Sequence, residues 1–334
     1  MVKIKLLMSK LALPKKGSNA RANAIALVIA VVFAAVGSLA TGFVSSALAQ
    51  SQAAGPVEAT AKSLLEKHTV LKERLANNAY GRPLYLESTE SGDLVSGNAY
   101  AVLDSPFSVV SSSFRNANAW CDVMILHINT KYCKTVAGSN PTILKVNVGK
   151  KTPQTLEDSF ALEFTMRQVR ATASLLMVQL NAENGPMGTS NYRIELQAAP
   201  LEENKTFMHL RYSYEYGLAG KLAMRGYLAT AGRGKVGFSS LPSTVNPAPA
   251  DAKPSYVGGA RGAVERNTMR YYLAIEAYLQ SLAQPPASQI NARLEKWFDA
   301  TEQYAVQLKE TDKVSYMTMK KSEIQRQQAS TPTP

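Results

Sequence analysis

Hydrophobic and polar residues alternate in seven segments between residues 83 and 216, which is the pattern of half-buried β-strands. In SFALEFTMRQV, for example, Phe160, Leu162 and Phe164 share one face of the expected strand. The turns between neighbouring segments are short, so we expect most consecutive strands to pair as an antiparallel meander with one dry face. The segments are PLYLEST, DLVSGNAYAVL, TILKVNV, SFALEFTMRQV, ASLLMVQL, NYRIELQAA and TFMHLRYSYEY.

Apolar residues recur at helical spacing in three further segments. Residues 56–76 predict an amphipathic helix, and residues 260–282 predict the longest helix, which is suited to lie across a sheet. Beyond Pro285 and Pro286 the helical spacing continues to about Thr311, and the final residues, QRQQASTPTP, are typical of a disordered tail. The apolar stripe of the longest helix consists of Val264, Thr268, Tyr271, Ile275, Tyr278, Leu279 and Leu282.

The first 49 residues have the pattern of a secretory signal peptide. Residues 1–21 contain six basic and no acidic residues, and the apolar run AIALVIAVVFAAVG follows. Ala47 and Ala49 supply the small side chains of a cleavage site, after which Gln50 would begin the exported chain. We expect a periplasmic protein; the alternative is an uncleaved N-terminal helix that anchors the chain in a membrane.

Charge and composition argue against a nucleic-acid partner. The net charge of +12 comes from 37 basic and 25 acidic residues, and removing the signal peptide with its six basic residues leaves 31 against 25, or +6. No run of Lys and Arg provides the footprint of a nucleic-acid binder. The 285 residues left from 334 after cleavage can bury a full core without a metal.

Both cysteines and one histidine lie in the segment WCDVMILHINTKYC. Zinc would need two ligands besides Cys121 and Cys133, and His127 is the only candidate nearby. A Cys/His nucleophilic site would need a free thiol, which an oxidising compartment tends to remove by pairing. The sequence therefore favours a disulfide between the two cysteines.

A disulfide at this spacing requires the chain to reverse. Twelve residue intervals would span about 40 Å as a strand or about 18 Å as a helix, whereas bridged Cα atoms lie within about 7 Å. Asn129 is the natural turn residue. We therefore expect residues 118–127 to be mostly helical and residues 130–136 to form a strand.

Motifs for catalysis are missing from the sequence. GLAGKL lacks the spacing and the Ser/Thr of a phosphate-binding P-loop, and no GxSxG nucleophile motif is present. His68 falls on a helix and His209 on a strand, where a structural role is the simpler interpretation. We predict no catalytic residues, no metal and no cofactor.

The order of elements resembles the START-like superfamily, also called SRPBCC, over residues 92–284. The resemblance lies in the helical pair DSPFSVVSSSFRNANAWCDVM after a strand, the run of antiparallel strands, and the long helix ARGAVERNTMRYYLAIEAYLQSL. It implies an α+β helix-grip fold, in which a curved antiparallel sheet grips a long C-terminal helix, here with added N- and C-terminal helices in an exported bacterial member. The expected order is a signal peptide at 1–49, a helix and first strand at 50–91, the START-like domain at 92–284, a helical extension at 285–325 and a disordered tail at 326–334.

The same resemblance implies a cavity between sheet and helix, which many relatives use for lipids or other hydrophobic ligands. We expect a binder or carrier of such a ligand; the alternatives are a non-enzymatic envelope assembly factor with a packed core and, third, a cyclase- or hydrolase-like enzyme. We expect the helix of the extension to pack on the domain; the alternative is that Trp297 and Phe298 offer a surface to a membrane or an envelope protein. The residues expected to line the cavity are Leu210, Tyr212, Tyr214, Val264, Thr268, Tyr271 and Ile275.

The disulfide generates a direct test. Alkylation of protein purified from the periplasm, without prior reduction, should leave Cys121 and Cys133 unlabelled in the mass spectrum. A loop of this length should stabilise the fold by about 3 kcal/mol. Two labelled thiols would contradict the pairing.

Overall fold

The computed structural model describes residues 61–230, 232–241 and 255–329. The expected signal peptide, with Ala47, Ala49 and Gln50 at its cleavage site, lies outside the described residues. Its cleavage and the periplasmic location therefore stay predictions. Within the described ranges, no helix combines the length and the apolar character that crossing a membrane requires.

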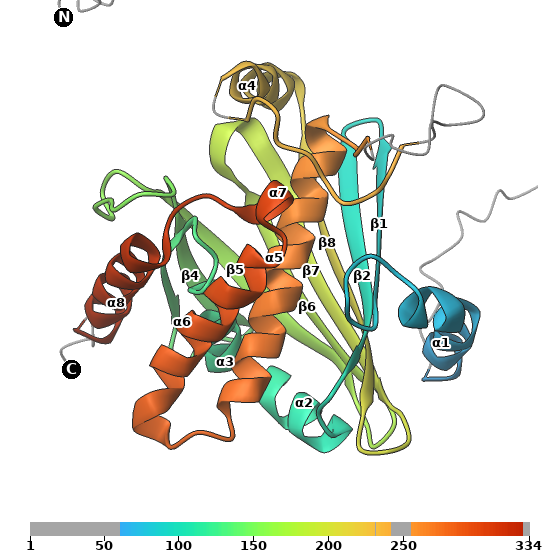
Figure 1. Ribbon diagram of the computed structural model, residues 1–334. Coiled ribbons are helices and arrows are strands. Elements are labelled where there is room, and N and C mark those ends of the chain that lie inside the picture. The colour runs from blue at the N-terminus through green and yellow to red at the C-terminus, as the bar shows by residue number, and fades with distance from the viewer. Residues whose placement is uncertain (1–60, 231, 242–254, 330–334) are drawn as a thin grey trace, which may run out of the picture. The chain divides into compact units, whose positions relative to one another are not determined.

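The described residues form one antiparallel sheet of eight strands (Figure 1). Its order is β1-β2-β8-β7-β6-β5-β4-β3, so the chain runs as a meander from β3 to β8 and the β1–β2 hairpin pairs with β8. The antiparallel meander predicted from the alternating segments is confirmed. The strands are β1 (Leu84–Ser91), β2 (Leu94–Leu103), β3 (Thr130–Thr135), β4 (Thr142–Val148), β5 (Phe160–Ala171), β6 (Leu176–Asn184), β7 (Thr189–Pro200) and β8 (Thr206–Tyr216).

Helices cover both faces of this sheet (Figure 1). The long helix α5 lies against β1, β2 and β8 on the inner face, and α6 packs on α5 from the other side. The predicted α+β fold, a curved antiparallel sheet gripping a long C-terminal helix, is confirmed. The helices are α1 (Ala61–Ala76), α2 (Phe107–Phe114), α3 (Ala117–Met124), the 3-10 helix η1 (Pro186–Gly188), α4 (Leu218–Ala229), α5 (Gly259–Ser281), α6 (Pro286–Glu302), α7 (Ala305–Leu308) and α8 (Lys313–Ala329).

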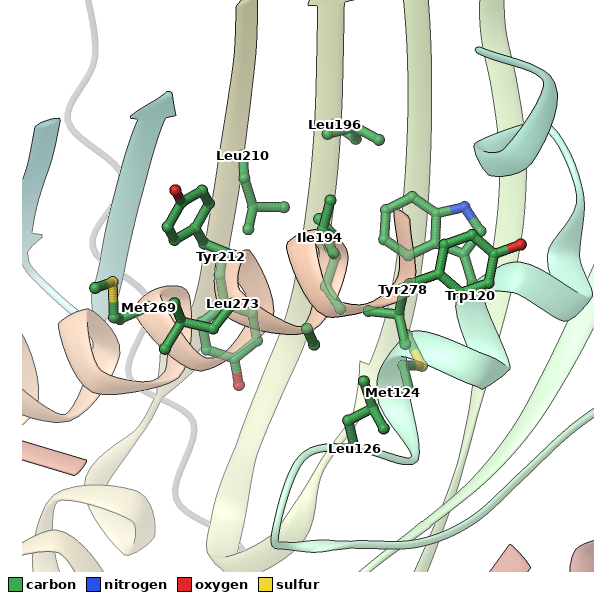
Figure 2. Close-up of a cluster of buried hydrophobic side chains, with 14 of the residues drawn as sticks. Trp120, Met124, Leu126, Ile194, Leu196, Leu210, Tyr212, Met269, Leu273 and Tyr278 are labelled. Carbon is green, nitrogen blue, oxygen red and sulfur yellow. The ribbon is translucent and has the colours of Figure 1, made fainter. Parts of the chain in front are cut away.

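The main core lies between the inner face of the sheet and α5. Figure 2 shows Leu210 of β8 and Ile194 of β7 directed toward the side of the sheet where α5 carries Met269 and Leu273. Trp120 of α3 fills the same layer and donates its indole N–H to the carbonyl of Phe114 at 3.0 Å. The alternation of the strands selects this face, because every second side chain points to it.

The outer face of the sheet is covered by α1. Leu64, Leu71 and Leu75 of this helix form a second apolar cluster with Tyr100 and Phe207. His209 is part of the same layer: its ring stacks on Tyr100 with centroids 4.2 Å apart. Burial lowers the pKa of His209 to about 3, so this histidine is uncharged at physiological pH and packs as an aromatic side chain.

A disulfide joins Cys121 of α3 to Cys133 of β3, with Cα atoms 5.1 Å apart. Between them the chain turns at Asn129, whose side-chain amide donates to the carbonyl of Gly149 at 2.6 Å. The helix ends at Met124, and the strand begins at Thr130, close to the predicted bounds.

The C-terminal segment differs from the prediction. Helical spacing predicts an end near Thr311 and a disordered tail from residue 326, but α8 begins after Asp312 and continues to Ala329. Asp312 caps the helix, because its carboxylate accepts the N–H of Ser315 at 2.9 Å. Trp297 and Phe298 are buried between the helices of this extension and the domain rather than displayed on a surface.

The described part of the polar tail, to Ala329, forms hydrogen bonds with the backbone of an edge strand. Arg326 donates to the carbonyl of Lys131 at 3.0 Å, and Gln327 accepts the backbone N–H of Cys133 at 2.9 Å. Strand β3 is an edge of the sheet, so these backbone groups have no neighbouring strand to pair with. Polar residues whose composition predicted disorder thus supply hydrogen bonds to the edge strand β3.

A buried ion cluster fastens α8 to the same region. Glu323 accepts from Lys131 at 3.1 Å and from Lys320 at 2.8 Å, and all three side chains are almost fully buried. Lys320 also donates to the carbonyls of His127 and Thr130, at 2.8 and 2.6 Å. Burial lowers the pKa of Lys320 to about 8, and Glu323 opposes this shift.

We expect Glu323→Gln to destabilise the protein by about 3–5 kcal/mol, because the change leaves two buried ammonium groups without a carboxylate. Urea denaturation measures this loss. Glu295→Gln, at an exposed position of α6, is the matched control and should change stability by no more than about 0.5 kcal/mol. Equal stability of the two variants would show that the cluster does not hold α8 in place.

Candidate functional site

A cavity of about 230 Å³ lies between the inner face of the sheet and the first half of α5. Strands β7 and β8 form one wall, α5 forms the opposite wall, and η1 with α4 covers the end. Asn129 and Lys151 complete the lining from two loops. The remaining lining residues are Pro186, Met187, Thr189, Tyr192, Tyr212, Tyr214, Gly220, Ala223, Met224, Ala263, Arg266, Asn267 and Arg270.

Three tyrosine rings form the sheet wall of the cavity. The ring centroid of Tyr192 lies 5.3 Å from that of Tyr214 and 6.2 Å from that of Tyr212. Burial raises the pKa of all three phenols, so they stay protonated and can donate hydrogen bonds at physiological pH. This wall offers flat apolar surface and hydroxyl donors together.

The three hydroxyls differ in what they bind. That of Tyr192 lies 2.8 Å from the hydroxyl of Thr189, and that of Tyr212 is hydrogen-bonded to Asn267. The side chain of Tyr214 is only 4% exposed, yet among the described residues its hydroxyl has no hydrogen-bond partner. The protein therefore leaves one hydroxyl donor available at the cavity.

The helix wall is cationic. Ala263, Arg266, Asn267 and Arg270 follow one face of α5 at spacings of three and four residues. Arg270 binds Glu310 at 2.8 Å. Burial opposes ionisation of Glu310, but Arg270 and the neighbouring lysines hold the pKa of this carboxyl below its usual value.

Arg266 has a different environment. It is 3% exposed and donates to the carbonyl of Val236 at 3.1 Å, and no carboxylate pairs with it in the part of the chain that the structure describes. Among the described residues, the lining of the cavity contains Lys151, Arg266 and Arg270 and no acidic residue. The cavity is thus suited to bind a hydrogen-bond acceptor or an anion and lacks the paired acid and base of a hydrolytic site.

Of the seven residues expected to line a cavity, Tyr212 and Tyr214 do so. Leu210, Val264, Thr268 and Ile275 are fully buried in the core beside it and do not reach the lining. Tyr271 of α5 is also outside the lining. Its ring centroid lies 5.4 Å from that of Tyr212 and 5.2 Å from that of His127.

Sequence reasoning missed several lining residues. Tyr192 could have been found, since it alternates with Ile194 and Leu196 on the inner face of NYRIELQAA. Arg266 and Arg270 carried no such signal, because charged residues on the far side of an apolar stripe are usually in contact with solvent.

The segment around His127 forms no metal site. His127 is buried, and its Nε2 lies 3.3 Å from the side-chain oxygen of Asn267. Burial, together with the nearby charges of Arg270 and Lys320, lowers the pKa of this imidazole well below its usual value. In the described ranges, no group of three or more His, Cys, Asp or Glu side chains could hold a metal ion.

No protein family matches this chain, and no curated protein matches it. Solved structures similar in fold include human StAR-related lipid transfer protein 5, with 9% identity and a TM-score of 0.34 over 67% of this chain and 96% of that one. The structure of Ara h 8.0201 has 10% identity and a TM-score of 0.33, over 56% and 99% of the two chains. A norcoclaurine synthase point mutant from Thalictrum flavum has 13% identity and a TM-score of 0.31, over 43% and 89%.

The free hydroxyl of Tyr214 can be tested by its effect on stability. Tyr214→Phe should change the free energy of unfolding by no more than about 0.5 kcal/mol, because no hydrogen bond within the described protein is lost. Tyr316→Phe is the matched control: the hydroxyl of Tyr316 is buried and donates to the carbonyl of Leu126 at 2.9 Å. Its removal should cost about 1–3 kcal/mol in the same urea titration. A comparable loss in Tyr214→Phe would mean that Tyr214 has an internal partner.

Proposed function

We propose that the protein binds a hydrophobic small molecule in the cavity between its sheet and α5. The observation that carries this proposal is the cavity itself: it is walled by Tyr192, Tyr212 and Tyr214 and contains an available hydroxyl within an otherwise close-packed interface. A few polar groups in a mostly apolar concavity are typical of small-molecule sites.

The size of the cavity narrows the choice of ligand. Its volume of about 230 Å³ is below the range of roughly 300–1,000 Å³ that is usual for drug-sized ligands. A complete membrane lipid does not fit, although part of an acyl chain does. We therefore favour a compact ligand, or one end of a longer one.

We also propose that the protein acts outside the cytoplasm, in the periplasm. The first 49 residues support export, and Ala47, Ala49 and Gln50 mark the expected cleavage site. The disulfide between Cys121 and Cys133 fits an oxidising compartment. Retention of the N-terminal segment as a membrane anchor is the alternative.

A second candidate is a non-enzymatic envelope assembly factor. Leu210, Val264 and Ile275 are fully buried at the centre of the sheet–helix interface, which favours a core filled by the protein's own side chains. In that case the cavity would be a packing gap, and the partner would be an envelope protein or a membrane surface. The described part of the cavity lining contains no acidic residue, so it gives no support to the third option, an enzyme.

Filling the cavity separates these candidates. Ala223 of α4 lines the cavity, and Ala229 of the same helix is exposed, so Ala223→Phe and Ala229→Phe form a matched pair. Native mass spectrometry and solvent extraction of the purified proteins should show a small hydrophobic molecule bound to the parent and to Ala229→Phe. Ala223→Phe should carry much less, because its added ring occupies the ligand's volume.

The contrary result is equally clear. If the parent protein carries no such molecule and shows no saturable binding of a fluorescent fatty acid, the cavity is not a ligand site. The packed assembly factor would then be the better description.

A further inference from the structure

We infer that the ligand of this cavity carries an oxyanion, a carboxylate or phosphate group on a small apolar body, which Arg266 and Tyr214 hold. This inference rests on the proposed function, since it names the chemistry of the ligand that the cavity would bind. It rests on two observations: the charge of Arg266 on the helix wall, and the hydroxyl of Tyr214 on the sheet wall.

The charge of Arg266 is the first observation. The residue is only 3% exposed, and its neighbours in the described ranges include no paired carboxylate. Burying an unpaired charge is costly, so such groups are normally paired. The same helix shows the usual solution one turn away, where Arg270 binds Glu310 at 2.8 Å. Arg266 lacks this internal counter-ion and faces the cavity.

The geometry of a guanidinium suits an oxyanion. Arginine presents five N–H donors in a planar fork that matches two oxygens of a carboxylate or phosphate. In the described protein, Arg266 uses this fork for one hydrogen bond, to the carbonyl of Val236. The remaining donors can bind a ligand without breaking that contact.

Tyr214 provides the second, independent observation. The residue is 4% exposed and lines the cavity, and its hydroxyl has no acceptor among the described residues. Arg266 and Tyr214 line the same cavity, from its helix wall and its sheet wall. A guanidinium and a phenol that both need an acceptor therefore converge on one region, while Tyr192 and Tyr212 supply flat surface for the apolar body.

Three probes with the same eight-carbon chain test this inference: octanoate, octyl phosphate and 1-octanol. Isothermal titration calorimetry of the parent protein should give at least tenfold tighter binding of one or both anions than of 1-octanol, as expected for charge-assisted hydrogen bonds, on the order of 10- to 100-fold. The better anion identifies the headgroup class.

Variants assign the effect to the named residues. Arg266→Gln should weaken binding of the preferred anion about 10- to 100-fold and change binding of 1-octanol by no more than about threefold. Arg225→Gln, at an exposed position of α4, removes a nearby charge outside the lining and should leave the anion's affinity unchanged within about threefold. Tyr214→Phe should weaken binding of the preferred anion by about tenfold.

The outcomes distinguish this inference from the proposed function. Binding of 1-octanol as tight as that of both anions, or undiminished anion binding by Arg266→Gln, would reject the oxyanion and keep a hydrophobic-ligand site. Failure of all three probes to bind would count against both. If Arg266→Gln does not fold, two measurements still test the oxyanion: the comparison of the three probes with the parent protein, and the anion affinity of Tyr214→Phe.

Discussion

The close contact between α5 and the sheet is the constraint on which the rest of the structure depends. A methyl group added at Gly97 of β2 would lie 2.3 Å from the hydroxyl oxygen of Thr268, so only glycine permits this approach. On its other side α5 is covered by α6, where the indole N–H of Trp297 donates to the carbonyl of Arg270 at 3.0 Å. A helix enclosed in this way buries most of its length, including the charged residues Glu265, Arg266 and Arg270.

Each charged residue of α5 must therefore find its partner inside the protein. Glu265 accepts the hydroxyl of Ser88 and the backbone N–H of Phe238, both at 2.6 Å. Arg270 pairs with Glu310 at 2.8 Å. Arg270 and Glu276 of this helix have salt-bridge partners, whereas among the described residues Arg266 has only the carbonyl of Val236. Local departures from otherwise satisfied packing are most often found at functional sites.

The sequence predicted the sheet well because alternation depends only on neighbouring residues along one strand. Leu210, Tyr212 and Tyr214 were placed on the inner face for this reason, and they lie there. The sequence could not distinguish the two tyrosines that line the cavity from Leu210, which belongs to the core. A gap in packing depends on several elements at once. The environment of Arg266 depended on the segment that contains Val236 and on the elements around the cavity, whose positions no local pattern encodes.

The cavity also lies beneath elements that expose large apolar side chains. Its cover consists of α4 and η1, and on this cover Leu218 is 78% exposed, Leu222 59% and Met187 65%. These side chains lose little buried apolar area when α4 moves, whereas displacement of a central strand would expose the main core. The deep part of the sheet–helix interface is fully packed, while the cavity lies at the end beneath α4. A packed core and a small ligand site are compatible in this fold, since they occupy different parts of the same interface.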